Sequence, residues 1–168
     1  YMPDGQNLLD PRTSHAEPWR VDKAMERAAQ RSVEAIVVAI PNRGIERIDE
    51  YSPFVDARAG GGKGDRYLDF VIDTVKPLVD ARFRTLPDRA HTGIAGSSLG
   101  GLISLYAYLE RSDVFGFAAA LSPALWFGDC AILGLAERAP RLAQVEKPRE
   151  AGDRNHGKNG SNGRGPLP

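Results

Sequence analysis

A serine flanked by glycines is the first feature of the sequence with recognisable chemistry. Residues 96–100 read Gly-Ser-Ser-Leu-Gly, which matches the pattern G-x-S-x-G with Ser98 at its centre. Residues 92–97 before it are typical of a strand, and residues 99–110 after it of a helix. A sharp strand-to-helix turn forces its middle residue into strained backbone angles, and only small neighbours let the chain approach itself. We therefore predict that Ser98 is a nucleophile held at the carboxyl end of a strand.

The residue after the serine has a second chemical function in such a turn. The N–H of Leu99 lies at the positive end of the predicted helix, where it can donate to a developing oxyanion. Ser97 is the competing serine, but it lacks the glycine spacing. The alternative interpretation is a glycine-rich turn in which Ser97 or Ser98 only caps the helix.

The segments around this motif indicate an α/β fold. Helical spacing of apolar residues predicts helices, and short apolar runs predict strands. The helices are residues 19–31, a segment that starts at the N-cap Asp65 and is ended or kinked at Pro77, and residues 129–142; the strands are 35–40 and 117–121. Residues 1–9 read as a strand end and a loop, and 43–64 as a long loop. Such alternation predicts a mainly parallel sheet flanked by helices, with residues 35–40 buried on both faces.

Composition excludes several other classes of function. The 168 residues carry 22 Lys and Arg against 22 Asp and Glu, so the chain has no strong field for nucleic acid. The longest aliphatic run, 35–40, is far too short to span a membrane. A single cysteine, Cys130, excludes an intrachain disulfide or a multi-cysteine zinc site, and we expect it to be a small buried hydrophobe. Residues 60–64 lack the context of a phosphate loop and predict a flexible loop.

Several motifs in order resemble the esterase D and enterochelin-esterase-like branch of the α/β-hydrolases. The resemblance covers residues 1–127. The matching motifs are YMPDGQNL at 1–8, Trp19 with VD at 21–22, AIVVAI at 35–40, Arg47, EYSP at 50–53, GGKGD at 61–65, the serine motif and LSPALW at 121–126.

This resemblance implies a serine hydrolase that cleaves carboxylic esters through an acyl-enzyme on Ser98. Residues 1–146 would form a partial α/β-hydrolase domain whose strand-to-helix turn is the nucleophile elbow. The backbone N–H groups of Leu99 and of Gln6 would form the oxyanion hole, and Trp126 would lie near the acyl or alcohol pocket. No metal or organic cofactor is implied, and the expected partner is a small-molecule or acyl-ester substrate.

The sequence departs from the family where a base and an acid are expected. A serine nucleophile needs a histidine base and an orienting acid, which follow the serine in this fold. After Ser98 the chain has one histidine, His156, within residues 147–168, a tail rich in Gly, Asn and Pro that we expect to be disordered. The nominal acids are Asp129, Glu137 and Asp153, none after a convincing strand; His15 and His91 are expected at the surface.

We therefore expect a chain truncated before its acid and histidine, with little turnover of its own. The change in composition after residues 140–141 resembles a frameshift or a misjoined end. Two other classes of function stay open at this point. The same elbow serves acyl transfer, as in the related mycolyltransferases, and a degenerate hydrolase-like domain could only bind a ligand or a partner. The acyl group, the alcohol, the compartment and the oligomeric state do not follow from the sequence.

Overall fold

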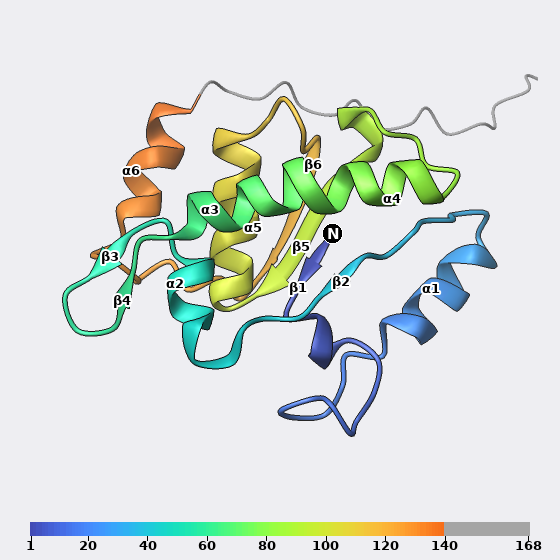
Figure 1. The fold of residues 1–168 in the computed structure, drawn as a ribbon, viewed down its shortest axis with the longest axis horizontal. Helices are drawn as coiled ribbons and strands as arrows, with labels where there is room; N and C mark the ends of the chain where they lie inside the picture. The colour runs from blue at the N-terminus through green and yellow to red at the C-terminus, as the bar shows by residue number, and fades with distance from the viewer. Residues whose placement is uncertain (140–168) are drawn as a thin grey trace, which may run out of the picture.

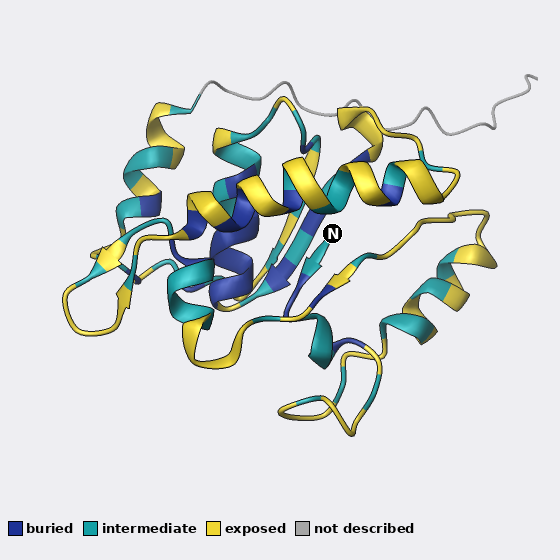
Figure 2. Ribbon diagram, in the orientation of Figure 1, coloured by how far each residue is buried: buried dark blue, intermediate teal, exposed yellow. Residues whose placement is uncertain are grey.

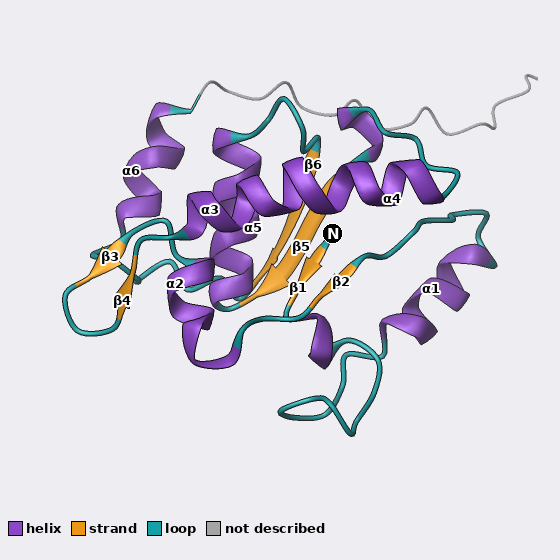
Figure 3. Cartoon of the chain, viewed as in Figure 1, coloured by secondary structure: helices purple, strands orange, loops and turns teal. Residues whose placement is uncertain are grey.

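The computed structural model describes residues 1–139, and its strands fall into three pairs. The strands are β1 (Met2–Pro3), β2 (Ala39–Ile40), β3 (Val55–Asp56), β4 (Gly60–Gly61), β5 (Gly93–Ser97) and β6 (Phe117–Leu121). The pairs β1–β2 and β5–β6 are parallel, and β3–β4 is an antiparallel hairpin. The Ala95 N–H donates to the Tyr1 carbonyl at 2.9 Å, so β1 lies beside β5 and the two parallel pairs are neighbours (Figure 3). The predicted α/β class is confirmed.

Helices alternate with these strands along the chain (Figure 1). The α-helices are α1 (Val21–Ala29), α2 (Arg47–Tyr51), α3 (Gly64–Phe70), α4 (Lys76–Arg82), α5 (Leu99–Glu110) and α6 (Ala131–Arg138); short turns η1 (Gly5–Asn7), η2 (Gly44–Glu46) and η4 (Arg89–His91) are 3₁₀, and η3 (Val71–Val75) is π-helical. The bounds of α5 and β6 are those predicted from the sequence. None of the described helices is long and apolar enough to cross a membrane.

The core lies between α5 and the parallel strands (Figure 2). Helix α5 is apolar on most of its surface, and its Leu102 and Ile103 are fully buried. Helix α3 lies beside α5, where the Tyr106 hydroxyl donates to Asp65 at 2.8 Å. Buried residues of α3, β5 and α5 belong to one cluster, which holds α5 against the sheet.

The opposite face of the sheet is open within residues 1–139. On β6, Phe117 and Leu121 are about half exposed, and the Phe117 ring lies over Gly93 of β5. Residues 35–40 were expected to form a strand buried on both faces, and this is wrong. The strand is only β2, and Ile36 and Val37 before it are exposed. In this part of the chain β2 has a neighbouring strand on one side alone, so its outer edge is not covered.

Three other local expectations need correction. The connection 43–64 was read as a long loop, yet it contains η2, α2 and the β3–β4 hairpin. Asp65 is not an N-cap, because α3 already starts at Gly64. Cys130 was expected to be buried, but it is exposed at the start of α6, where its φ of 60° places it in the left-handed region.

Two expectations concern the ends of helices. The helix does not end at Pro77, because α3, η3 and α4 follow one another without a break as far as Arg82; the change is a π-helical turn just before this proline, which cannot donate a helical hydrogen bond. The predicted helix 129–142 is α6, which begins at Ala131 and ends at Arg138 with Ala139 extended; residues 140–142 of the prediction lie outside the described residues. So do the predicted tail 147–168, His156 and Asp153.

Candidate active site

Ser98 stands alone between β5 and α5 with an unusual backbone. Its φ of 55° and ψ of −121° lie in a region that only glycine adopts readily. The residue is exposed, although Gly96 before it and Leu99 after it are buried. Because Ser98 follows the last residue of a parallel strand, its side chain lies at the carboxyl edge of the sheet. Strand, strained turn and helix thus occur in the order that the sequence pattern requires.

The glycines around Ser98 are needed because other backbone comes very close. A Cβ on Gly96 would collide with the carbonyl oxygen of Gly100 and would lie 2.9 Å from Pro3. A Cβ on Gly101 would lie 3.1 Å from the Cα of Pro123. The spacing of small residues therefore reflects a real close approach of the two sides of the turn.

The loop after β6 is tied to the same turn. The Ser98 N–H donates to the Leu121 carbonyl at 3.2 Å, and the Ser98 carbonyl accepts from the Ala124 N–H at 3.0 Å. Trp126 follows in this loop with 68% of its surface exposed. The structure therefore places Trp126 a few residues from a direct backbone contact with Ser98.

A second loop reaches this region from the end of β1. Asp4 is 7% exposed and adopts a left-handed conformation with φ 57°, and η1 starts at the next residue. Its carboxylate oxygen lies 3.2 Å from the place that a Cβ on Gly100 would occupy. Gly5 crosses the end of β2 so closely that a Cβ would lie 2.6 Å from the Ile40 nitrogen. The loop that carries Gln6 is thus packed between the first turn of α5 and β2.

Side chains from α2 and its approach hold Asp4 in this place. Arg47 donates from Nε to Oδ1 at 2.7 Å and from Nη2 to Oδ2 at 2.8 Å. Asn42 donates to Oδ1 at 2.6 Å, and the Asp4 N–H donates to the Tyr51 hydroxyl at 2.8 Å. Burial raises the pKa of Tyr51, so this hydroxyl stays neutral. Both carboxylate oxygens and the backbone N–H of Asp4 therefore have hydrogen-bond partners.

Sequence reasoning missed this cluster. Asp4, Arg47 and Tyr51 were read only as parts of motifs that match the family, without a contact between them. A signal was present, because an aspartate, an arginine and a tyrosine all stood in motifs that share one family pattern. The long distance in sequence between residues 4 and 47 hid their contact.

The two predicted oxyanion donors come from different segments, Leu99 from the start of α5 and Gln6 from the loop after β1. Leu99 is the first residue of α5, and the first N–H groups of a helix have no helical acceptor. The Gln6 carbonyl accepts from the Thr13 hydroxyl at 2.8 Å, and its side-chain oxygen accepts from the Asn42 N–H at 3.2 Å. The site also has a clear gap: in residues 1–139 the Ser98 hydroxyl has no hydrogen bond to a histidine or a carboxylate.

The candidate bases and acids of the described part lie elsewhere. His91 pairs with Asp88 before β5, and the extended residues 92–97 lie between it and Ser98, so the two residues stand at opposite ends of β5. His15 is exposed in the loop before α1. Asp129 and Glu137 are exposed near and on α6. His156 and Asp153 lie outside the described residues.

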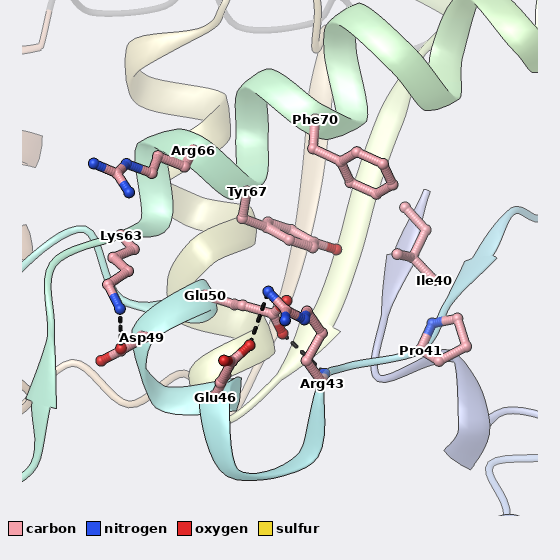
Figure 4. Close-up of a pocket in the computed structure, with 10 residues that line it drawn as sticks. All are labelled: Ile40, Pro41, Arg43, Glu46, Asp49, Glu50, Lys63, Arg66, Tyr67 and Phe70. Atoms are coloured by element: carbon pink, nitrogen blue, oxygen red, sulfur yellow. Dashed lines mark hydrogen bonds and ion pairs between the residues drawn. The ribbon is translucent and has the colours of Figure 1, made fainter.

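A cavity of about 630 Å³ lies between η2, α2 and α3 (Figure 4). Tyr67 and Phe70 of α3 form its apolar side together with Ile40. Two ion pairs line it, between Arg43 and Glu46 at 2.8 Å and between Lys63 and Asp49 at 2.6 Å. Ser98 is not among the lining residues, so this cavity is separate from the turn that carries the serine.

Comparison with known proteins gives consistent relatives. The siderophore triacetylfusarinine C esterase of Aspergillus fumigatus is 31% identical over 137 residues, which are 79% of this chain and 46% of that protein. The uncharacterized protein YbbA of Bacillus subtilis is 29% identical over 123 residues, 69% of this chain and 48% of its own length. The chain thus spans about half the length of the curated relatives it matches.

Solved structures show the same fold. Enterobactin hydrolase IroE in complex with DFP superposes with a TM-score of 0.66 at 23% identity, over 85% of this chain and 57% of that one. The siderophore hydrolase EstA from Aspergillus nidulans gives a TM-score of 0.61 at 21% identity, over 82% of this chain and 49% of that one. A family model described as "Putative esterase" matches residues 1–155. The chain therefore belongs to this esterase family, whose relatives here include siderophore and enterobactin hydrolases.

Proposed function

We propose that the protein hydrolyses carboxylic esters with Ser98 as the nucleophile, and that the fold is part of an α/β-hydrolase domain. The observation that carries this proposal is the backbone of Ser98, with φ 55° and ψ −121° at an exposed turn between β5 and α5. A strained conformation at a non-glycine residue is retained when the surrounding structure holds it for a function. Here the glycines on both sides and two backbone hydrogen bonds hold it.

The proposed reaction proceeds in two steps. The Ser98 Oγ attacks the ester carbonyl carbon, the bond from that carbon to the alcohol oxygen breaks, and the acyl group stays on Ser98. A base takes the hydroxyl proton and returns it to the leaving alcohol; water then releases the acid by the same route. The backbone N–H groups of Leu99 and Gln6 donate to the carbonyl oxygen while it carries negative charge.

The substrate class follows from the relatives and from one side chain. Two of the relatives are named as esterases or hydrolases of siderophores, so siderophore esters are the first substrates to test. Trp126 offers a large exposed aromatic surface on the loop that contacts Ser98. We assign it to the wall of the acyl or alcohol pocket. The base is not among the groups that contact Ser98 within residues 1–139.

Covalent labelling with a fluorophosphonate probe tests the nucleophile. Because no base contacts Ser98 within residues 1–139, we expect slow labelling to a single adduct, which peptide mass spectrometry places on Ser98. Ser98→Ala should abolish the adduct, whereas the matched variant Ser97→Ala should keep it. His156→Ala, measured beside them, shows whether this histidine outside the described residues activates the serine.

Two results would overturn the proposal. One is a folded chain, with the circular dichroism and thermal transition of the parent, that takes up no probe. The other is labelling that persists in Ser98→Ala. Products formed from an ester with an added alcohol acceptor then separate hydrolysis from acyl transfer, because a new ester forms only in the second case.

A further inference from the structure

The loop that carries Gln6 is held by an ion pair that takes no direct part in the proposed reaction. Asp4 contributes a buried carboxylate, with its side chain 10% exposed, and Arg47 meets it with two hydrogen bonds. Two parallel hydrogen bonds between a guanidinium and a carboxylate fix orientation as well as distance. Arg47 belongs to α2, a helix of five residues that is otherwise remote in sequence from β1 and β5.

The same residue links the two halves of the proposed oxyanion site. The Asp4 carboxylate lies against Gly100 in the first turn of α5, and Pro3 lies against Gly96 and Gly100. A shift of Asp4 therefore moves the Gln6 loop relative to Leu99 and Ser98. Catalysis depends steeply on such placement, because donors must point at the place where charge develops.

The backbone of Asp4 shows why a fixing contact is needed. A left-handed φ of 57° is less favourable than a right-handed one, although aspartate tolerates it better than most residues, so contacts that hold it keep the loop in one conformation. The Tyr51 hydroxyl accepts the Asp4 N–H, and Asn42 and Arg47 bind the carboxylate. The Arg47 guanidinium also lies over the Tyr51 ring, 5.3 Å from its centroid. These contacts restrain the backbone and the side chain of one residue together.

We propose that Arg47 is a positioning residue for ester hydrolysis: by clamping Asp4 it fixes the Asp4–Gln6 loop against α5, so that the Gln6 N–H keeps its place beside Ser98. Arg47 acts through Asp4 and needs no contact with the substrate. This inference rests on the proposed function, since it assigns the Gln6 loop to the oxyanion site.

The test compares Arg47→Met with Arg47→Lys and with the control Arg43→Met. Arg43 pairs with Glu46 at an exposed position, so its loss removes one arginine without touching Asp4. The rate of reaction with a fluorophosphonate is measured over probe concentration, which separates the maximal rate from the apparent affinity. We expect Arg47→Met to lower the maximal rate about 100-fold with little change of affinity, because a displaced donor affects bond formation.

The conservative variant sharpens this test. Arg47→Lys keeps the charge but lacks the planar guanidinium that makes two parallel hydrogen bonds in a fixed orientation, so it should recover part of the rate. Arg43→Met should leave the rate unchanged. Equal maximal rates in Arg47→Met and the parent would overturn the proposal. If Arg47→Met does not fold, Arg47→Lys and Tyr51→Phe decide, because each weakens the clamp while keeping the packing of its site.

Hydrogen exchange provides a readout that does not depend on catalysis. We expect the amides of residues 4–8 to lose at least about tenfold more protection in Arg47→Met than those of residues 94–103, whose exchange reports the lower global stability of the variant. Unchanged exchange in residues 4–8 would show that Arg47 does not fix the loop. A parent that is folded but unreactive would refute the proposed function alone, and the exchange result would still decide the role of Arg47.

Discussion

Two ion pairs that include a residue of α2 differ in how much they contribute to the stability of the fold. On one side Arg47 meets Asp4 beneath the first turn of α5, where the two side chains are 28% and 10% exposed. On the other side Asp49 meets Lys63 at the rim of the cavity beneath α3, where the exposed fractions are 32% and 54%. The ion pairs are equally short, at 2.7 and 2.6 Å. Distance alone therefore does not distinguish them, and burial does.

Burial changes the consequence of losing one partner. A charge at the surface is hydrated when its partner is removed, so an exposed pair contributes little to stability. A buried carboxylate without its cation is left without water and without a full set of donors. We therefore expect the Asp4–Arg47 pair to stabilise the fold, and the Asp49–Lys63 pair to contribute little to stability.

The largest expected effect comes from breaking the buried pair. Arg47→Met should lower the free energy of unfolding by about 3 kcal/mol, the lower end for a broken buried pair because Arg47 keeps some contact with solvent. The measurement is urea denaturation followed by circular dichroism, with Lys63→Met as the matched control. A loss of the same size in both variants would remove the distinction between the two ion pairs.

A comparable loss is expected where the turn admits no side chain. Gly96→Ala should destabilise the protein by about 1–3 kcal/mol, because its methyl group meets the Gly100 carbonyl and Pro3. The control is Gly134→Ala in α6, where the nearest atom is the mobile end of Arg138 at 3.3 Å. This second change should be neutral or stabilising, because alanine favours a helix. The measurement is the midpoint of thermal unfolding of each variant. Equal midpoints for Gly96→Ala and Gly134→Ala would contradict the close approach at the turn.

The ease of predicting these regions from sequence also differs. The strand, the turn and the helix at Ser98 are adjacent in the chain, so apolar spacing and glycines were enough to locate β5 and α5. The clamp joins Asp4 to Arg47 across 43 positions, and no local pattern reports such a contact. The expectation that residues 35–40 are buried failed for a related reason, because burial of a strand depends on neighbours supplied by other parts of the chain.

The predictions for the site concern either the position of a residue or its chemical role. The position of Ser98 between a strand and a helix follows from local sequence and is present in the structure. Whether its hydroxyl is activated depends on a base and an acid that are not in contact with it within residues 1–139. The labelling experiments therefore test these chemical roles, whereas the backbone that would support them is already formed in residues 1–139.

The smallest expected effect concerns the exposed pair and its dependence on pH. The hydrogen bond from Lys63 is the first cause that lowers the pKa of Asp49, and the Gly61 N–H adds to it at 3.0 Å. Lys63→Met should therefore raise the pKa of Asp49 toward its ordinary value, as measured by the carboxyl carbon shift in an NMR titration. Its stability at neutral pH should stay within experimental error of the parent, because the pair is solvated.

The sign of the pH effect follows from linkage. A carboxyl group with a lowered pKa in the folded state stabilises the fold above its unfolded pKa, and this contribution disappears as pH falls through the folded pKa. Any small difference between Lys63→Met and the parent should thus vanish in acid. The measurement is the free energy of unfolding of both proteins from neutral pH down to the titration range of Asp49. A difference between them that grows as the pH falls would contradict this expectation. Such a result would mean that Lys63 acts on another group and that the rim of the cavity contributes to the stability of the fold.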